Sequence, residues 1–323
     1  MTDELKLLRG ANPVPAGGPH YGDGPLGHHA ERHLDRLLRD RAPGRRPRRL
    51  GWGLAAAVVA ATVSALLLSG PGTAPAVAAP RPLVVQTGST PLPLDRIAER
   101  ARAAADGGSP RLRKGTHVQS WSLGMADDGP PITLPEERVV RWRADGSHTE
   151  LVVATDPRHP GRPVLTDEDG GPRKVADGHV LSDRTYPPSW SDAPPGSPPP
   201  QSPVRLRAYL AEVARSTSTY PSTPELLDAV QDLLDNWTLG PRESAALTGL
   251  LANAGGLHPV GRVTDRLGRP GQAYVHDAHG SRRMLILDPA TGAVLGLETT
   301  FTTDQPQYGV RAGDVMEYSA WMR

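Results

Sequence analysis

The sequence predicts an α+β fold, with one antiparallel sheet and a central group of helices, preceded by one transmembrane helix. Three observations lead to this prediction. Gly51 to Ser69 is a run of 19 residues without charge, and a basic stretch lies directly before it. Beyond residue 93, strand-like segments are followed by helical segments and then by strand-like segments again. That order favours an antiparallel sheet over parallel βαβ units.

The uncharged run is long enough to cross a membrane. At 1.5 Å per residue it spans about 28 Å, close to the hydrocarbon core of about 30 Å. Gly70-Pro71-Gly72 then ends the helix, since proline cannot continue it. We expect membrane lipid to contact the large apolar residues of the run, which are Trp52, Leu54, Val58, Val59, Val63, Leu66, Leu67 and Leu68.

The charges on either side of the run predict its orientation. The 24 residues after Ser69 contain one charge, Arg81, whereas arginines crowd the other side. The topology-determining residues are Arg41, Arg45, Arg46, Arg48 and Arg49. Short basic flanks remain in the cytoplasm, so we expect a single-pass plasma membrane protein with its N-terminus inside and its C-terminal domain outside.

A cleaved signal peptide is the alternative to an anchor. Ala76-Val77-Ala78 is an A-x-A cleavage pattern that follows the apolar run. Cleavage there would release a free exported domain. The 50 residues before the apolar run are long for a signal peptide, so we favour the uncleaved anchor. The C-terminal part is exported in both cases.

These signals divide the chain into four parts. Residues 1–50 form a basic cytoplasmic tail, mostly flexible, and residues 51–69 form the transmembrane helix. Residues 70–92 form a stalk rich in alanine and proline, and residues 93–323 form the extracytoplasmic α+β domain.

The domain is expected to begin with a helix and three strands. Apolar residues at helical spacing predict a helix over 94–105. The expected strands cover 116–125, 138–143 and 148–155. Asp145-Gly146 predicts a hairpin between the last two.

Helices and then further strands follow. Ser202-Pro203 and Thr223-Pro224-Glu225 are typical helix starts. The expected helices cover 203–215, 223–236 and 242–253. The expected strands cover 260–265, 272–276, 283–287, 294–300 and 315–321.

Composition and motifs argue against several kinds of chemistry. The chain has no cysteine, which excludes disulfides, thiolate nucleophiles and cysteine-ligated zinc. Neither a hydrolase motif such as G-x-S-x-G nor a phosphate-binding glycine loop is present. After residue 69 there are 26 basic and 29 acidic residues, so we expect no nucleic-acid binding. We therefore expect no enzymatic activity and no cofactor.

Two clusters of potential metal ligands have simpler interpretations. His28, His29, Glu31 and His33 could bind a transition metal, but no further ligand is specified and a solvated polar segment is the favoured interpretation. The segment Asp167-Glu168-Asp169-Gly170 could hold Ca²⁺ weakly, although it lacks EF-hand spacing. We expect a surface turn there, and we predict no metal site.

Tryptophan is notable because phenylalanine occurs once. Large amphipathic rings could line a ligand groove, whereas packing in the core of the sheet and helices is the simpler interpretation. The residues concerned are Trp121, Trp142, Trp190, Trp237 and Trp321. Trp142 alternates with two arginines and should point to the buried face of its strand.

Short motifs add a resemblance to a known family. They are Asp3-Glu4-Leu5 with Leu7-Leu8-Arg9, Asn12-Pro13-Val14-Pro15, the anchor at 51–69, Gly261 to Asp265, and Leu287 to Gly292. With them the chain resembles a large family of actinobacterial single-pass membrane proteins, mostly uncharacterised and known by a locus-tag name. The N-terminal element is similar to that of membrane-bound anti-sigma factors. The resemblance implies no catalytic residues.

The leading hypothesis is a non-enzymatic, membrane-anchored envelope protein whose outer domain binds a ligand or partner, in a regulatory or sensory role. The cytoplasmic tail would then have a protein partner of its own. Two alternatives are an exported carrier or chaperone-like domain for lipid or polypeptide, and an envelope hydrolase.

Overall fold

The computed structural model describes residues 80–107, 110–126, 129–168, 171–188, 197–214 and 221–322. The chain divides into two units, residues 1–69 and 70–323, and every described residue belongs to the second. The predicted span, the topology-determining arginines and the histidine cluster lie outside the described residues. Within the described ranges, none of the helices is long and apolar enough to cross a membrane.

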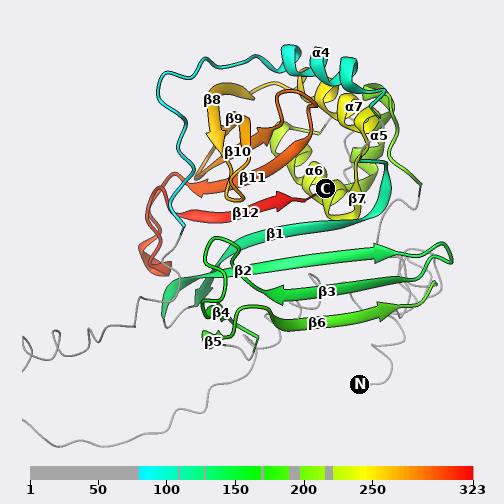
Figure 1. Ribbon diagram of the computed structural model, residues 1–323. Helices are drawn as coiled ribbons and strands as arrows, with labels where there is room; N and C mark the ends of the chain where they lie inside the picture. Colours follow the sequence, from blue (N-terminus) through cyan, green and yellow to red (C-terminus); the bar gives the residue numbers. More distant parts are fainter. Residues whose placement is uncertain are drawn as a thin grey trace, which may run out of the picture. The chain divides into compact units, whose positions relative to one another are not determined.

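The described part of the chain is built on one large antiparallel sheet (Figure 1). Its strands lie in the order β6-β3-β2-β1-β12-β11-β10-β9-β8, and β7 pairs with β1 outside this path. The strands are β1 (Arg113–Ala126), β2 (Gly129–Trp142), β3 (His148–Ala154), β6 (His179–Tyr186), β7 (Trp237–Thr238), β8 (His258–Thr264), β9 (Pro270–Ala278), β10 (Ser281–Leu287), β11 (Val294–Phe301) and β12 (Val315–Trp321). A separate two-stranded hairpin consists of β4 (Val164–Thr166) and β5 (Arg173–Val175).

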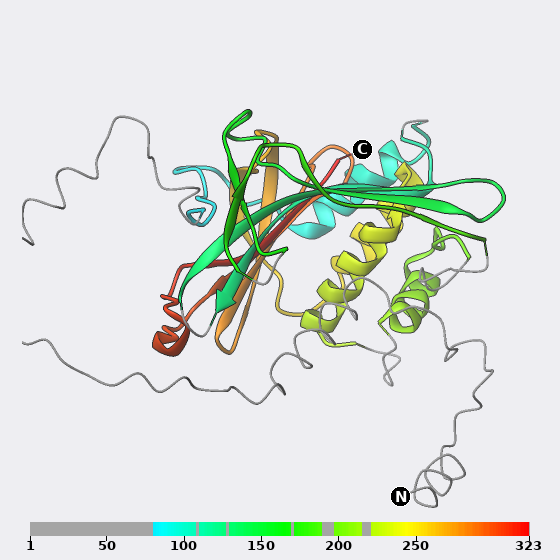
Figure 2. The ribbon, with the colours of Figure 1, turned by 90° about the horizontal axis from the view of Figure 1, so that it is seen from below.

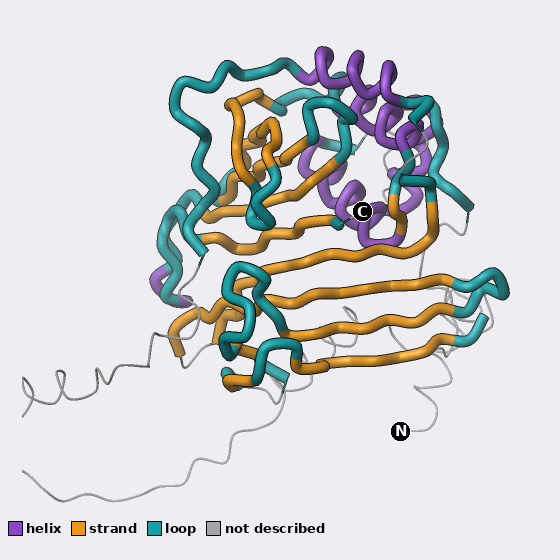
Figure 3. Tube along the Cα trace, in the orientation of Figure 1, coloured by secondary structure: helices purple, strands orange, loops and turns teal. Residues whose placement is uncertain are grey.

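The helices follow the sequence prediction closely. They are α4 (Leu94–Ala104), α5 (Pro203–Val213), α6 (Thr223–Asn236) and α7 (Pro241–Leu251), and a short 3-10 turn covers Pro306–Tyr308. Figure 2 shows α5, α6 and α7 on one side of the sheet, and Figure 3 shows the helices gathered beside one end of the strands. The predicted α+β class with an antiparallel sheet is therefore confirmed for this part of the chain.

Four short or exposed strands are not predicted by the sequence pattern. β4, β5 and β7 contain two or three residues each, too few to show a period. β6 is longer, but it is the outer strand of the sheet, and its exposed and half-buried residues do not alternate regularly. Without a buried face, an edge strand carries little hydrophobic pattern.

The two faces of the sheet carry two separate apolar cores. Val118, Leu285 and Trp321 point to the helices and pack with their apolar residues. We call this side the helix face. Their neighbours along the strands, among them Trp121 and Tyr318, point the other way and form the second core.

The second core is completed by residues 81–90, which we call the strap, and we call this side of the sheet the strap face. Leu83 and Val85 pack against the core, whereas Val84 between them is 79% exposed. This alternation is that of an extended strand with one buried side. From the sequence, residues 81–90 were expected in the stalk. They belong instead to the folded domain.

Candidate functional site

Helix α6 forms because its first turn is capped and one of its sides is apolar. The Ser222 backbone N–H donates to Glu225 Oε2 at 2.7 Å, and Pro224 lies in the first turn. The apolar side of the helix, which includes Leu226 and Leu233, is buried in the core of the helix face.

A second side of α6 is acidic. Asp228, Asp232 and Asp235 follow one another at spacings of four and three residues. Residues at these spacings lie on the same face of a helix. The helix therefore carries a row of carboxylates along its length, next to the apolar face that packs on the sheet.

Two arginines of the sheet hold α6, one near each end. Arg283 of β10 donates to the Pro224 carbonyl at 2.9 Å and forms an ion pair with Asp228 at 2.6 Å. Arg138 of β2 donates to the Asp235 carbonyl at 3.2 Å and forms an ion pair with Glu150. Each arginine thus bonds a backbone carbonyl of the helix as well as a carboxylate.

These two attachments show that α6 bridges the middle of the sheet. Four strand spacings separate β10 from β2, about 19 Å at about 4.8 Å each. A helix of 14 residues is about 21 Å long. The helix is therefore long enough to reach from one arginine to the other across β11, β12 and β1.

The sheet contributes a fourth carboxylate to this region. Arg283, Thr299 and Glu317 are cross-strand neighbours on β10, β11 and β12. The Thr299 hydroxyl donates to Glu317 Oε1 at 3.4 Å. We call Asp228, Asp232, Asp235 and Glu317 the α6 carboxylate cluster.

Three members of the cluster have raised pKa values. Asp232 is exposed, but neighbouring protein atoms reduce the hydration of its carboxylate, and this desolvation together with the carboxylates of Asp235 and Asp228 raises its pKa to about 6. Burial also raises the pKa of Asp235, even though Arg138 and a bond from Trp321 Nε1 at 2.9 Å favour its charged form. Burial raises the pKa of Glu317 too, against the attraction of Arg283.

The local charges do not balance. Four carboxylates share Arg138 and Arg283, and Arg138 is also paired with Glu150. The raised pKa values of Asp232, Asp235 and Glu317 mean that ionising these three carboxylates costs free energy in the folded protein. A cationic hydrogen-bond donor, such as an ammonium or guanidinium group, would lower this free-energy cost.

Within the described ranges, no group of three or more histidine, aspartate or glutamate side chains could hold a metal ion.

On the opposite side of the same strands lies the attachment of the strap. Glu298 of β11 is 1% exposed, forms an ion pair with Arg266 and accepts the Leu83 N–H at 2.8 Å. Arg266 also donates to the Arg81 carbonyl at 2.9 Å and stacks over the Tyr318 ring. A buried ion pair therefore lies between the strap and the sheet.

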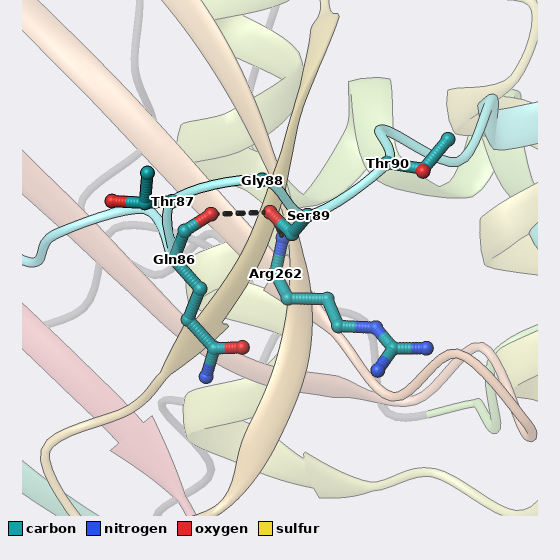
Figure 4. A pocket seen from close by; sticks show the side chains of 6 residues that line it. All are labelled: Gln86, Thr87, Gly88, Ser89, Thr90 and Arg262. Carbon is teal, nitrogen blue, oxygen red and sulfur yellow. Dashed lines mark hydrogen bonds between the residues drawn. The ribbon is translucent and has the colours of Figure 1, made fainter.

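A polar hollow of about 350 Å³ marks the other end of the strap (Figure 4). It is lined by Gln86 to Thr90 and by Arg262 of β8. The Gln86 N–H donates to the Arg262 carbonyl at 2.8 Å, and Ser89 Oγ accepts the Arg262 N–H at 3.0 Å. The hollow is thus the place where the turn of the strap folds over the edge strand β8.

The tryptophans lie where core packing would put them. Trp121, Trp237 and Trp321 are at most 7% exposed and belong to the two cores. Trp190 lies outside the described residues. These three side chains therefore line no groove.

Trp142 is half-buried and belongs to a row that crosses four strands. Lys114 Nζ lies 3.4 Å from the centre of the Trp142 ring, and His148 stacks on its other face at 4.1 Å. Tyr186 stacks on His148 at 4.5 Å. Trp142 thus points to the same face of its strand as buried Val140, as predicted, and its ring packs between Lys114 and His148.

The predicted acidic turn is only partly described. Glu168 forms ion pairs with Arg173 at 3.2 Å and with His179 at 3.3 Å. Asp169 and Gly170 lie outside the described residues. Of the two carboxylates of this turn that the structure describes, Asp167 and Glu168, that of Glu168 therefore contacts the side chains of Arg173 and His179.

The α6 carboxylate cluster was not predicted from the sequence. One signal was available, since acidic residues recur at helical spacing beside the apolar face of α6. The partners Arg138, Arg283 and Glu317 come from strands far apart in the sequence. Only the strand order brings them to one helix.

The described part of the chain is thus a largely antiparallel α+β domain with an acidic helix across its sheet. No protein-family model, curated protein or solved structure matches the chain significantly.

Proposed function

We propose that the chain is a non-enzymatic, membrane-anchored envelope protein whose outer domain binds a ligand or partner at the α6 carboxylate cluster. The ligand carries a basic group, an ammonium or a guanidinium. The cytoplasmic tail passes the signal to a partner inside the cell.

One observation carries the binding site. Four carboxylates gather around α6, three of them with raised pKa values, and among the described residues Arg138 and Arg283 are the arginines that contact this helix. Clusters of perturbed titratable groups are typical of functional sites. Contacts from Arg283 of β10, Thr299 of β11 and Trp321 of β12 hold the carboxylates of Asp228, Glu317 and Asp235 before any ligand arrives, which lowers the entropy lost on binding.

The cellular location is supported by the sequence. The uncharged run 51–69 and the arginines before it favour an anchor with the outer domain outside. In this arrangement the acidic site faces the envelope, where amine-bearing or arginine-bearing partners can reach it.

A titration with spermidine tests the binding site. Spermidine is added to the full chain in detergent micelles and its heat of binding is measured at pH 7. We expect Asp232→Asn to weaken binding at least about tenfold, because a carboxylate that contacts the amine is lost. The matched control is Asp277→Asn, which removes an exposed carboxylate paired with Arg282 outside the cluster. Equal affinities of the Asp232→Asn and Asp277→Asn variants would refute the proposed site.

A further inference from the structure

We infer that the strap protects the β8 edge of the sheet from pairing with a second copy of the chain. While the strap is docked the chain stays monomeric, and when it is released two copies pair through β8. This inference goes beyond the proposed binding site, which lies on the helix face and takes no part in it.

The strap occupies the hydrogen-bonding side of β8. Among the described strands, β8 pairs with β9 alone and ends the strand order of the sheet. The Arg262 carbonyl accepts the Gln86 N–H at 2.8 Å, and the Arg262 N–H donates to Ser89 Oγ at 3.0 Å. An edge strand without such partners presents N–H and C=O groups that another strand can bind. The strap therefore takes the place of a further strand beside β8.

The turn of the strap satisfies this edge without extending the sheet. The Ser89 N–H donates to the Gln86 carbonyl at 3.1 Å, and Ser89 Oγ donates to the same carbonyl at 2.7 Å. Because the hydroxyl proton points to Gln86, the oxygen lone pairs are free to accept the Arg262 N–H. A side-chain oxygen thus binds the edge where a paired strand would offer a backbone carbonyl.

The turn packs directly against the backbone of Gly261 on β8. The register of β8 and β9 shifts between Pro259 and Gly261, and Gly261 has a φ of 128°. A β-carbon there would lie 2.5 Å from Ser89 Oγ and 2.9 Å from a methyl carbon of Val85. Both distances are too short for a real contact, so the docked strap requires a residue without a side chain at this position.

The strap also covers apolar residues at this edge. Leu83 and Val85 pack on the core of the strap face, together with Val260 and Val263 of β8. Release of the strap would expose these two valines of β8 beside the unpaired backbone groups of Arg262. Apolar side chains next to an unpaired edge are typical of strands that associate with another chain.

A second copy of the chain meets both requirements of this edge. Two β8 strands that pair antiparallel are related by a twofold axis perpendicular to the sheet, so the strap faces of both copies lie on the same side. The two strands would bind each other's backbone groups, and the exposed valines at 260 and 263 of the two copies would adjoin. Pairing would therefore satisfy the backbone and cover apolar surface at once.

Light scattering and hydrogen exchange of the full chain in detergent micelles test this inference. Val85→Asp places a charge in the core of the strap face and leaves β8 unchanged. We expect the strap peptide 81–90 to exchange its amides faster in this variant, and the protein mass per micelle to rise from one copy to two. The peptide over 258–264 should stay slow, because the second copy replaces the strap as the partner of β8.

The matched control is Val84→Asp, the same change at the exposed neighbour, which should leave exchange and mass unchanged. A monomeric Val85→Asp chain with a fast strap, or a dimer whose 258–264 peptide also exchanges fast, would overturn the inference. A strap that stays slow in Val85→Asp, or an unmodified chain that is already dimeric, would overturn it as well. If Val85→Asp does not fold, Gly261→Ala displaces the strap from the side of β8 and decides in the same way.

Discussion

Glu298 and Thr299 are consecutive residues of β11 that serve opposite faces of the sheet. Glu298 accepts the Leu83 N–H and pairs with buried Arg266, whereas Thr299 donates to Glu317 beside α6. Because side chains alternate along a strand, one residue step separates the strap from the acidic helix. The strap is thus part of the domain and lies directly behind its candidate binding site.

The ion pair between Arg266 and Glu298 should be essential for stability. Glu298→Gln leaves the guanidinium of Arg266 buried without a carboxylate, and we expect the free energy of unfolding to fall by about 3 kcal/mol. Chemical denaturation of the full chain measures this. Glu99→Gln, which breaks an exposed ion pair with Arg96 on α4, should change the free energy of unfolding by less than about 1 kcal/mol. Similar losses in both variants would contradict the importance of burial.

The strap should depend on one valine and not on its neighbour. Val85 packs on the core of the strap face, whereas Val84 is 79% exposed. We expect Val85→Ala to lower the free energy of unfolding by about 1 kcal/mol, since part of two buried methyl groups is lost. Val84→Ala should leave it nearly unchanged. Denaturation of both variants gives the comparison, and equal values would show that the strap is not docked.

Acid should stabilise the region around α6. The pKa of Asp232 is raised from 3.8 to about 6, so its contribution is fully present below about pH 4 and is lost as the pH rises through about 6. We therefore expect Asp232→Asn to be more stable than the wild type at pH 7. The difference should vanish near pH 4 in thermal denaturation.

Asp277, whose pKa is lowered and not raised, provides the control. The hydrogen bond from Arg282 lowers the pKa of Asp277, so its contribution is present at neutral pH and lost as the pH falls. Asp277→Asn should therefore be less stable than the wild type at pH 7. If Asp232→Asn and Asp277→Asn changed the stability at pH 7 in the same direction, the destabilisation assigned to the charge of Asp232 would be wrong.

Orientation in the membrane should follow the arginines. Replacing Arg41, Arg45, Arg46, Arg48 and Arg49 by asparagine removes the basic flank, and we expect a reporter fused after Arg323 to lose its uniform outside location. The same number of arginine replacements within residues 96–113 should have no such effect. A reporter that faces the cytosol in the unmodified chain would contradict the proposed anchor.

Local patterns in the sequence determined most of the elements. The helix start at Thr223-Pro224-Glu225 and its apolar period led to the bounds 223–236, which are those of α6. The turn at Gly146 also follows from the sequence, since glycine adopts its φ of 84° readily. Periodicity, caps and turns depend on neighbours within a few residues, so the sequence reports them directly.

The tertiary structure alone decided where the candidate site lies. Arg138, Arg283 and Glu317 meet at α6 because β2, β10 and β12 take particular places in the sheet. The strap was assigned to a stalk because it lies within a segment rich in alanine and proline whose sequence shows no partner, yet the Leu83 N–H donates to Glu298 at a separation of 215 residues. Contacts at such separations depend on strand order and register, which the local pattern of a chain does not contain.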